Sequence, residues 1–437
     1  MSRQPKNWVV MRLRLVYLAT VLLIISRAMH VSGKMQVGVN LGFLGDNLPS
    51  VSRTVELLTD LHAGAVRLYD GNPEVLKALR NRPQEVIVSV RNDQLQEFAS
   101  SPDAADMWVQ NHVVPFYPAT KITFIAVGNE VLREGTIESD AQYFSQALRN
   151  VYGALVARNL HDAIKVISPL SGEILGTSWP PSRGYFEHLE YIRPLLQFLQ
   201  DTGSTFFINL YPYYAHIADS VFISFEYAAF QATEPIFIDP QSNMLYYNLF
   251  EAMVDAAYNA MEDLGFPDLP LVVGETGWPS GGGQAATIQN AELFNNNLIK
   301  HVSSKGTPQR PHVRTPVFIF ALFNENQKPG PDFERYWGLL NADGTPVYPI
   351  DLADPNLEQQ ANPDIVAADA VAPPLQGAAS ADGALVNPTV ALDENVIIDD
   401  VAIIGDALED VLHLLGPSPA PFSVVFKTIM DHAPGFP

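Results

Sequence analysis

The stretch FIAVGNE, residues 124–130, is an apolar run of β type that ends on a glutamate, Glu130. A second stretch, LVVGETGW at residues 271–278, has the same form and carries Glu275. A charged residue directly after such a run is expected at the carboxyl end of a buried parallel strand, where the loops of an α/β barrel build active sites. Two carboxylates facing one cavity are the minimum for breaking a glycosidic bond, because one protonates the leaving oxygen and the other meets the developing positive charge. The pair predicts a glycosidase.

Outward from these stretches, short runs rich in β-branched or aromatic residues alternate with longer amphipathic segments, as in repeated βα units. Their number and the length of chain they span predict an α/β fold, a (β/α)8 TIM barrel, over residues 34–350. An open doubly wound sheet is the alternative, but GFLGDN at 42–47 lacks the Gly-x-Gly-x-x-Gly phosphate turn. The predicted strands are 36–40, 65–69, 85–90, 122–127, 164–167, 205–210, 271–274 and 316–322, which places Glu130 after the fourth and Glu275 after the seventh.

Two of the intervening segments show clear helical spacing. Residues 50–62 carry apolar side chains on one face, with Gly64 just beyond as a stop signal. Residues 141–159 repeat the pattern, and Asp140 is the predicted cap of that helix.

The two ends of the chain differ from the middle. Residues 1–33 hold five basic and no acidic residues, an apolar run from 15 to 25 and small residues near Gly33, the order of a secretory signal peptide. An uncleaved anchor is the alternative. Residues 351–437 are rich in Ala, Pro and Asp and carry fourteen acidic residues against Lys427, which predicts an acidic, mostly irregular tail with a short helix at 396–415. The alternative is a tail that packs on the barrel.

Composition narrows the function further. The net charge of −22 disfavours binding to nucleic acid or anionic lipid and favours a neutral polymer as partner. The chain has no cysteine, which excludes thiolate-bound zinc and thiol catalysis. The ten histidines show no close pair at ligand spacing, so no metal and no other cofactor is expected. We expect a secreted, extracellular or cell-wall monomer with no stable membrane insertion once the signal peptide is removed.

A set of motifs in fixed order makes a family resemblance specific. Together they are similar to the plant-type β-1,3-glucanases of glycoside hydrolase family 17. Two departures affect detail: Leu41 stands where a tyrosine is common in this family, and Arg91 where a smaller residue is frequent. The matching stretches are GVN (38–40), DNLP (46–49), RLYD (67–70), VGNEV (127–131), PPS (180–182), NLYPY (209–213), GETGWPS (274–280), FALFNEN (320–326), KPGP (328–331), ER (334–335) and WGL (337–339).

The resemblance implies a retaining mechanism with Glu130 as the acid/base and Glu275 as the nucleophile. Their carboxyl groups should then lie about 5–5.5 Å apart. Independently of the resemblance, Asn129 directly precedes Glu130 as a neutral donor, and we expect it to hold a sugar hydroxyl beside the reacting carbon. The side chains that the resemblance places around the nucleophile and the sugar subsites are Tyr69, Tyr211, Phe323, Glu325, Lys328 and Glu334.

Each supporting residue also has a structural interpretation. Without the resemblance, Lys328 and Glu334 read as an exposed ion pair of little consequence, and the tyrosines as packing at the barrel top. Arg67 would be costly in a barrel interior without an acidic partner, and Glu275 is the candidate. We interpret Trp278 and Trp337 as structural.

The leading hypothesis is a secreted enzyme that cleaves internal β-1,3-glucosidic bonds of glucans of the callose or laminarin type. One alternative is a catalytically inert β-glucan-binding wall protein. Another is a hydrolase of the same fold that acts on mixed-linkage β-1,3;1,4-glucan.

Overall fold

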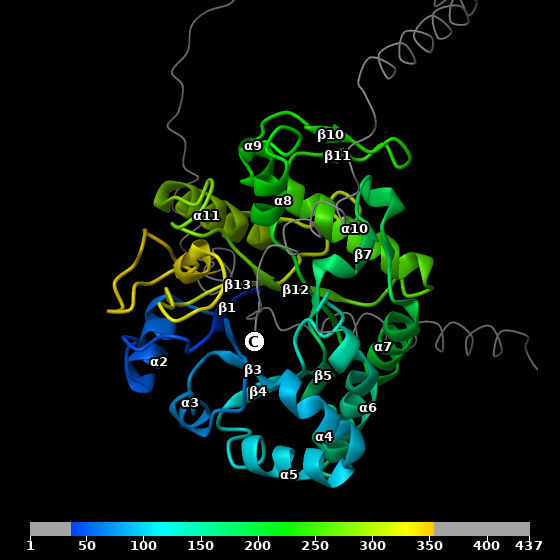
Figure 1. The fold of residues 1–437 in the computed structure, drawn as a ribbon, viewed down its shortest axis with the longest axis vertical. Coiled ribbons are helices and arrows are strands. Elements are labelled where there is room, and N and C mark those ends of the chain that lie inside the picture. Colours follow the sequence, from blue (N-terminus) through cyan, green and yellow to red (C-terminus); the bar gives the residue numbers. More distant parts are fainter. Residues whose placement is uncertain (1–35, 136, 354–437) are drawn as a thin grey trace, which may run out of the picture. The chain divides into compact units, whose positions relative to one another are not determined.

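The computed structural model describes residues 36–135 and 137–353. The predicted signal peptide and its cleavage near Gly33 lie outside these residues, as do the tail from residue 354 onward and its predicted helix at 396–415. Nine parallel strands of the described part form one sheet, around which helices are arranged in a ring (Figure 1). The strands are β1 (Val37–Leu41), β2 (Ala65–Leu68), β3 (Glu85–Val90), β4 (Lys121–Val127), β5 (Lys165–Ile167), β6 (Leu170–Ser171), β9 (Phe206–Asn209), β12 (Leu271–Thr276) and β13 (Val317–Ile319).

The sheet closes on itself through a broken fifth strand. Its order is β5-β4-β3-β2-β1-β13-β12-β9-β6, so β5 and β6 occupy the two edges. These two strands are separated in the chain only by Ser168 and Pro169, while β5 pairs with β4 and β6 pairs with β9. They are therefore two halves of one barrel position, and the predicted eight-stranded barrel is confirmed. The prediction of a single strand at 164–167 was incomplete, because Pro169 has no N–H for continuous pairing.

The last strand is shorter than predicted. The expected run at 316–322 is a strand only over Val317–Ile319. Beyond Ile319 the backbone pairs with a later segment: Ala321 N donates to Trp337 O at 3.0 Å, and Leu340 N donates to Leu322 O at 2.9 Å. The apolar run continues after the strand ends because its side chains stay buried in this second pairing.

Most of the helices cover the outside of the barrel, and shorter elements lie in the loops that follow the strands (Figure 1). The outer helices are α2 (Val51–Asp60), α3 (Pro73–Ala78), α4 (Leu95–Ser100), α5 (Pro102–His112), α6 (Ile137–Val156), α7 (Leu189–Thr202), α10 (Leu249–Asp263) and α11 (Ile288–Ser304). The loop elements are α8 (Pro212–Ala218), α9 (Phe225–Ala228), the strand pairs β7 (Leu175–Thr177) with β8 (Tyr185–Phe186) and β10 (Phe237–Ile238) with β11 (Leu245–Tyr246), and the 3₁₀ turns η2 (Asn92–Gln94), η3 (Gly172–Ile174), η4 (Pro181–Arg183) and η5 (Asp332–Tyr336).

Two predicted helix ends are wrong. Helix α2 begins after Ser50, whose side chain accepts a hydrogen bond from Arg53 N, but the left-handed residue that ends it is His62 (φ 56°) and not Gly64. Helix α6 begins at Ile137, so Asp140 lies inside it and caps nothing. The earlier start follows from the preceding turns, in which Ile137 N already donates to Arg133 O at 3.0 Å.

Aromatic side chains fill part of the barrel interior. The rings of Phe124 and Phe207 lie 5.4 Å apart between centroids, and those of Phe207 and Phe318 lie 6.3 Å apart. They come from β4, β9 and β13, which are not neighbours in the sheet, so these contacts cross the interior. Gly38 on β1 leaves the space that Phe318 occupies, because a Cβ there would lie 2.5 Å from its ring. The barrel is a packed core, and a site is expected only at its rim.

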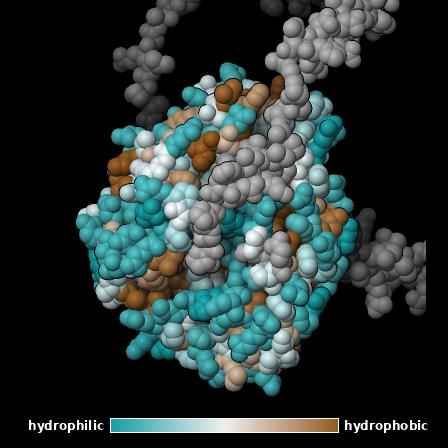
Figure 2. Space-filling view, in the orientation of Figure 1, coloured by the Kyte–Doolittle hydropathy of each residue, from teal (hydrophilic) through white to brown (hydrophobic). Residues whose placement is uncertain are grey.

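The surface of the described part is mainly polar. Figure 2 shows hydrophilic residues over most of the visible face, with hydrophobic residues in small separate groups among them. The most exposed large apolar side chains, Val221 at 86% and Phe222 at 66%, follow α8. In the part of the chain that the structure covers, no helix combines the length and apolar character needed to cross a membrane.

Candidate active site

The two glutamates reach the carboxyl ends of the barrel strands in different ways. Glu275 is the fifth residue of the six-residue strand β12, so the strand runs past it and the prediction that the strand stops at Gly274 was wrong. Glu130 stands three residues beyond the end of β4 in a turn where both Gly128 (φ 71°) and Glu130 (φ 53°) are left-handed. A left-handed conformation is uncommon for a residue with a Cβ and is often found at functional sites.

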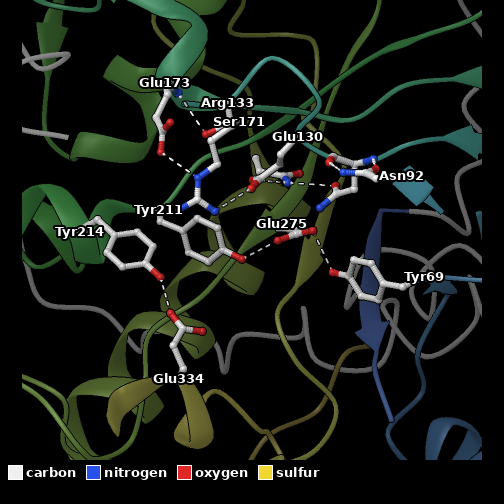
Figure 3. A network of polar contacts seen from close by, with 12 residues as sticks. Tyr69, Asn92, Glu130, Arg133, Ser171, Glu173, Tyr211, Tyr214, Glu275 and Glu334 are labelled. Carbon is white, nitrogen blue, oxygen red and sulfur yellow. Dashed lines mark hydrogen bonds and ion pairs between the residues drawn. The ribbon is translucent and has the colours of Figure 1, made fainter. Parts of the chain in front are cut away.

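Three donors hold the carboxyl group of Glu275, and Figure 3 shows the two tyrosines among them. Arg67 Nη1 donates to Oε1 at 3.1 Å, and the hydroxyl of Tyr69 donates to the same oxygen at 2.8 Å. The hydroxyl of Tyr211 donates to Oε2 at 2.8 Å. One cation and two hydroxyl donors stabilise the charged form of a carboxylate and fix its orientation, which is what a nucleophile requires.

The arginine predicted to pair with Glu275 does so from the barrel interior. Arg67 lies on β2 and is 0% exposed. Besides Glu275 it donates to Gly274 O at 3.0 Å and to Asn129 Oδ1 at 2.6 Å. A buried guanidinium needs such partners, because an unpaired buried charge is very costly. The ion pair between Arg67 and Glu275 confirms the partner inferred from the sequence.

Glu130 is contacted by a different set of groups. Asn209 Nδ2 donates to its Oε1 at 2.8 Å, and Arg133 Nη1 lies 3.7 Å from its Oε2. Burial raises the pKa of the Glu130 carboxyl above its ordinary value, and the nearby charge of Glu275 raises it further, against the opposing charges of Arg133 and Arg67. A raised pKa favours the protonated form of a carboxyl group, which is the form that a general acid needs.

Asn129 links the two glutamates. Its Oδ1 accepts from Arg67, which holds Glu275, and lies 3.5 Å from Nδ2 of Asn209, which holds Glu130. Asn92 fixes its backbone, since Asn129 N donates to Asn92 Oδ1 at 2.7 Å and Asn92 Nδ2 donates to Asn129 O at 2.9 Å. A short chain of hydrogen bonds therefore joins residues from β2, β9, β12 and the turn after β4 in one polar cluster.

The tyrosines that face Glu275 remain protonated. Burial raises the pKa values of Tyr69 and Tyr211 well above the ordinary value, and the charge of Glu275 adds to this effect. As protonated groups, both hydroxyls donate to the carboxyl oxygens of Glu275. Their role goes beyond the packing interpretation, although the rings also pack: Tyr211 and Trp337 lie 5.2 Å apart between ring centroids.

A second group of predicted residues lies in the loops after β13. Lys328 Nζ is 3.3 Å from Glu334 Oε2, and these side chains are 8% and 2% exposed, so the interpretation as a surface ion pair is wrong. Tyr214 donates to Glu334 Oε1 at 2.8 Å, and Lys328 also lies over the ring of Phe320 at 3.6 Å. Glu325 Oε1 accepts from Leu44 N at 2.6 Å, and burial raises the pKa of Glu325.

The remaining predicted positions are buried. Phe323 is 2% exposed and pairs with Leu340 through its backbone, and contact between its side chain and a sugar stays a prediction. Trp278 is 0% exposed and donates from its ring nitrogen to Ala285 O, in keeping with a structural role. Leu41 is buried at the end of β1, and Arg91 pairs with Asp93 at the surface. Within the described residues, no three His, Cys, Asp or Glu side chains lie together as metal ligands.

The sequence did not single out Asn209, Arg133 or Glu173, which the structure brings to Glu130. Asn209 is the last residue of β9, so the same strand-end rule that selected Glu130 would have found it. Glu173 follows the second half of the broken fifth strand, and no local pattern marks its position.

A (β/α)8 barrel whose mouth holds two buried glutamates in different environments has the site of a glycosidase. The model of glycosyl hydrolases family 17 matches residues 37–352, and this chain belongs to that family. It is 42% identical over 345 residues to glucan endo-1,3-beta-glucosidase 4 of Arabidopsis thaliana, covering 77% of this chain and 68% of that protein. It is 41% identical to a glucan endo-1,3-beta-glucosidase of Vitis vinifera, covering 73% and 92%.

Solved structures agree with the fold. CJP38, a beta-1,3-glucanase and allergen of Cryptomeria japonica pollen, superposes with a TM-score of 0.70 at 45% identity, covering 73% of this chain and 99% of CJP38. One of two plant beta-glucan endohydrolases described as having distinct substrate specificities gives a TM-score of 0.67 at 38% identity, covering 72% and 99%. The residues of this chain outside these matches are mainly its two ends.

Proposed function

We propose that this protein is a retaining hydrolase that cleaves internal β-1,3-glucosidic bonds of β-glucans. The observation that carries the proposal is the contrast between the two glutamates at the barrel mouth. Three donors hold the carboxyl group of Glu275 in place, while burial and the charge of Glu275 raise the pKa of Glu130. One group is prepared to attack and the other to donate a proton. The relatives named as glucan endo-1,3-beta-glucosidases support the choice of linkage.

In the first step an oxygen of Glu275 attacks the anomeric carbon, and the bond from that carbon to the leaving oxygen breaks. Glu130 gives its proton to the leaving oxygen, so the shortened chain departs as an alcohol and a glycosyl ester remains on Glu275. In the second step Glu130 removes a proton from water, and the resulting oxygen attacks the same carbon and releases Glu275. Both glutamates return to their starting states.

The supporting residues have proposed roles that follow from their contacts. Arg67, Tyr69 and Tyr211 hold Glu275 against rotation, and Asn129 contacts both Arg67 and Asn209, which bind the two carboxyl groups. Glu325, Lys328 and Glu334 form a buried polar group suited to sugar hydroxyls, and Phe323 is proposed to contribute an apolar contact with the sugar. We also propose that residues 1–33 direct the chain to secretion, which suits an extracellular glucan.

The test is digestion of laminarin by the purified protein, with reducing ends measured from acidic to neutral pH. We expect release of short oligosaccharides from the interior of the chain and an initial product of β configuration by proton NMR. No release at any pH would contradict hydrolysis, and an initial α product would contradict retention.

Substrate class is tested separately with mixed-linkage β-1,3;1,4-glucan. The similarity to two endohydrolases of distinct specificity makes this the second candidate. Cleavage of the mixed-linkage polymer alone would reassign the substrate. Binding of both polymers without cleavage would favour the inert glucan-binding protein.

A further inference from the structure

Arg133 lies between the proposed acid/base and a second buried carboxyl group (Figure 3). Its Nη1 is 3.7 Å from Oε2 of Glu130, and its Nε is 3.5 Å from Oε1 of Glu173. The side chains of Arg133 and Glu173 are each 12% exposed, and that of Glu130 is 19% exposed. One guanidinium is thus shared by two carboxyl groups that are largely shielded from water, where electrostatic interactions are strong.

The barrel brings these residues together through its fourth and fifth strands. Arg133 lies in the turn after β4, and Glu173 lies on η3 directly after β6. The two segments are tied by the hydrogen bond from Glu130 N to Pro169 O at 2.9 Å. The side chain of Ser171 caps η3 by accepting from Glu173 N at 3.2 Å, which fixes the start of the turn that carries the second carboxyl group.

Glu173 can change its charge near neutral pH. Burial raises the pKa of the Glu173 carboxyl to about 7, with Arg133 opposing the rise and the charges of Glu130 and Glu134 adding to it. A hydrogen bond from the backbone of Glu134 favours the charged form. Among the described residues, Oε1 of Glu173 accepts no hydrogen bond, so its principal partner is the guanidinium of Arg133.

The other groups that face this pair do not replace it. Tyr214 on α8 is near both Arg133 and Glu130, but burial raises its pKa far above the ordinary value, so it remains neutral. Arg67 and Glu275 act on Glu130 from β2 and β12, and Arg67 is already committed to Glu275 and Asn129. The charge that varies beside Glu130 near neutral pH is therefore that of Glu173.

We propose that Arg133 and Glu173 are a positioning pair that sets how strongly Glu130 holds its proton. An ionised Glu173 draws the guanidinium toward itself and repels negative charge on Glu130, and both effects keep Glu130 protonated. A neutral Glu173 leaves the guanidinium to Glu130 and favours loss of the proton. The pair thereby extends the pH range in which the acid remains loaded. The inference rests on the proposed role of Glu130 as acid/base.

The test compares Glu173→Gln and Arg133→Gln, which remove opposite charges from one pair. Carboxyl carbons are labelled with ¹³C in all glutamates, the Glu130 signal is assigned with Glu130→Gln, and its titration is followed by NMR. We expect the Glu130 midpoint to fall in Glu173→Gln and to rise in Arg133→Gln, each by about half to one pH unit. The matched control is Asp106→Asn, which breaks the ion pair of Arg158 on the outer helices and should leave the midpoint unchanged.

The same variants are then assayed on laminarin. In a plot of kcat/KM against pH, the alkaline limb should move to lower pH in Glu173→Gln and to higher pH in Arg133→Gln, as the NMR midpoints do. The proposal would be overturned if the NMR midpoints and the alkaline limbs stayed in place while kcat fell equally at every pH. It would also be overturned if both variants shifted in the same direction. If the wild type hydrolyses no glucan, the proposed function fails, and the NMR titration still decides whether the pair controls the proton on Glu130.

Discussion

The two sides of the candidate site hold their carboxyl groups in different ways. Glu275 is in a strand and is held by one arginine and two tyrosines at 2.8–3.1 Å. Glu130 is in a left-handed turn, accepts a hydrogen bond from the amide of Asn209 at 2.8 Å, and has an oxygen 3.7 Å from Arg133 Nη1. The same residue type is therefore surrounded by three donors on one side, while on the other side burial raises its pKa. Environment, and not side-chain identity, assigns the two roles.

The largest expected effect on kcat comes from removing the carboxyl group of Glu275 on β12. We expect Glu275→Gln to lower kcat on laminarin on the order of 10⁴-fold or more, because no covalent intermediate can form. Binding of laminarin oligosaccharides, measured by calorimetry, should stay within a few-fold of the wild type. Turnover equal to that of the parent would show that Glu275 is not the nucleophile.

The effect of removing Glu130, the acid in the turn after β4, should depend on the leaving group of the substrate. Glu130→Gln is expected to lower kcat on laminarin by about 10²- to 10⁴-fold. The loss should be much smaller on an aryl β-glucoside oligomer whose leaving group needs no protonation. Equal losses on both substrates would contradict a role as proton donor and would remove the contrast between the two glutamates.

Arg67→Met tests the structural side of the comparison. It leaves Glu275 buried without its cation, and breaking a buried pair from one side typically costs about 3–5 kcal/mol in the free energy of unfolding. Urea unfolding followed by circular dichroism measures the change. The control is Arg53→Met, whose partner Glu56 is half exposed at the surface, and for which a change below about 1 kcal/mol is expected. If Arg67→Met lowered the free energy of unfolding no more than the control, the interior ion pair would contribute little to stability.

The smallest expected effect concerns single hydrogen bonds to Glu275. Tyr69→Phe and Tyr211→Phe each remove one donor from the carboxylate, and a bond to a charged group contributes about 1.5–3 kcal/mol, equivalent to roughly a 10- to 100-fold loss in kcat/KM. Tyr246→Phe is the matched control, because its hydroxyl donates to Asp255 at 3.0 Å away from the cluster. If all three variants behaved alike, the tyrosines would act through packing alone.

The sequence predicted much of this site because its residues follow the strands. Glu130, Glu275 and Arg67 were selected by their positions at or near strand ends and by the cost of burying a charge, and the structure joins them through Asn129. Residues without such a signal were missed. Glu173 follows a strand that Pro169 interrupts, so counting runs of apolar residues gave no reason to look there.

Local pattern was also a poor guide to boundaries and burial. Asp140 has the right chemistry for a cap but lies inside α6, because helical turns had already begun at Glu130 and Arg133. Lys328 and Glu334 resemble a surface pair, yet the aromatic side chains of Phe320 and Tyr214 enclose them. Such enclosure depends on loops that are distant in sequence.

The sequence by itself determined the alternation of strands and helices, the family and the two glutamates, because each is encoded in local runs of apolar residues and short motifs. Only the tertiary structure decided the difference in environment between the two glutamates. That property depends on burial and on donors from β2, β9 and the turn after β4, which meet only when the barrel closes. The charge of Glu173 beside Arg133 belongs to the same category, since it arises where the fourth and fifth strands come together.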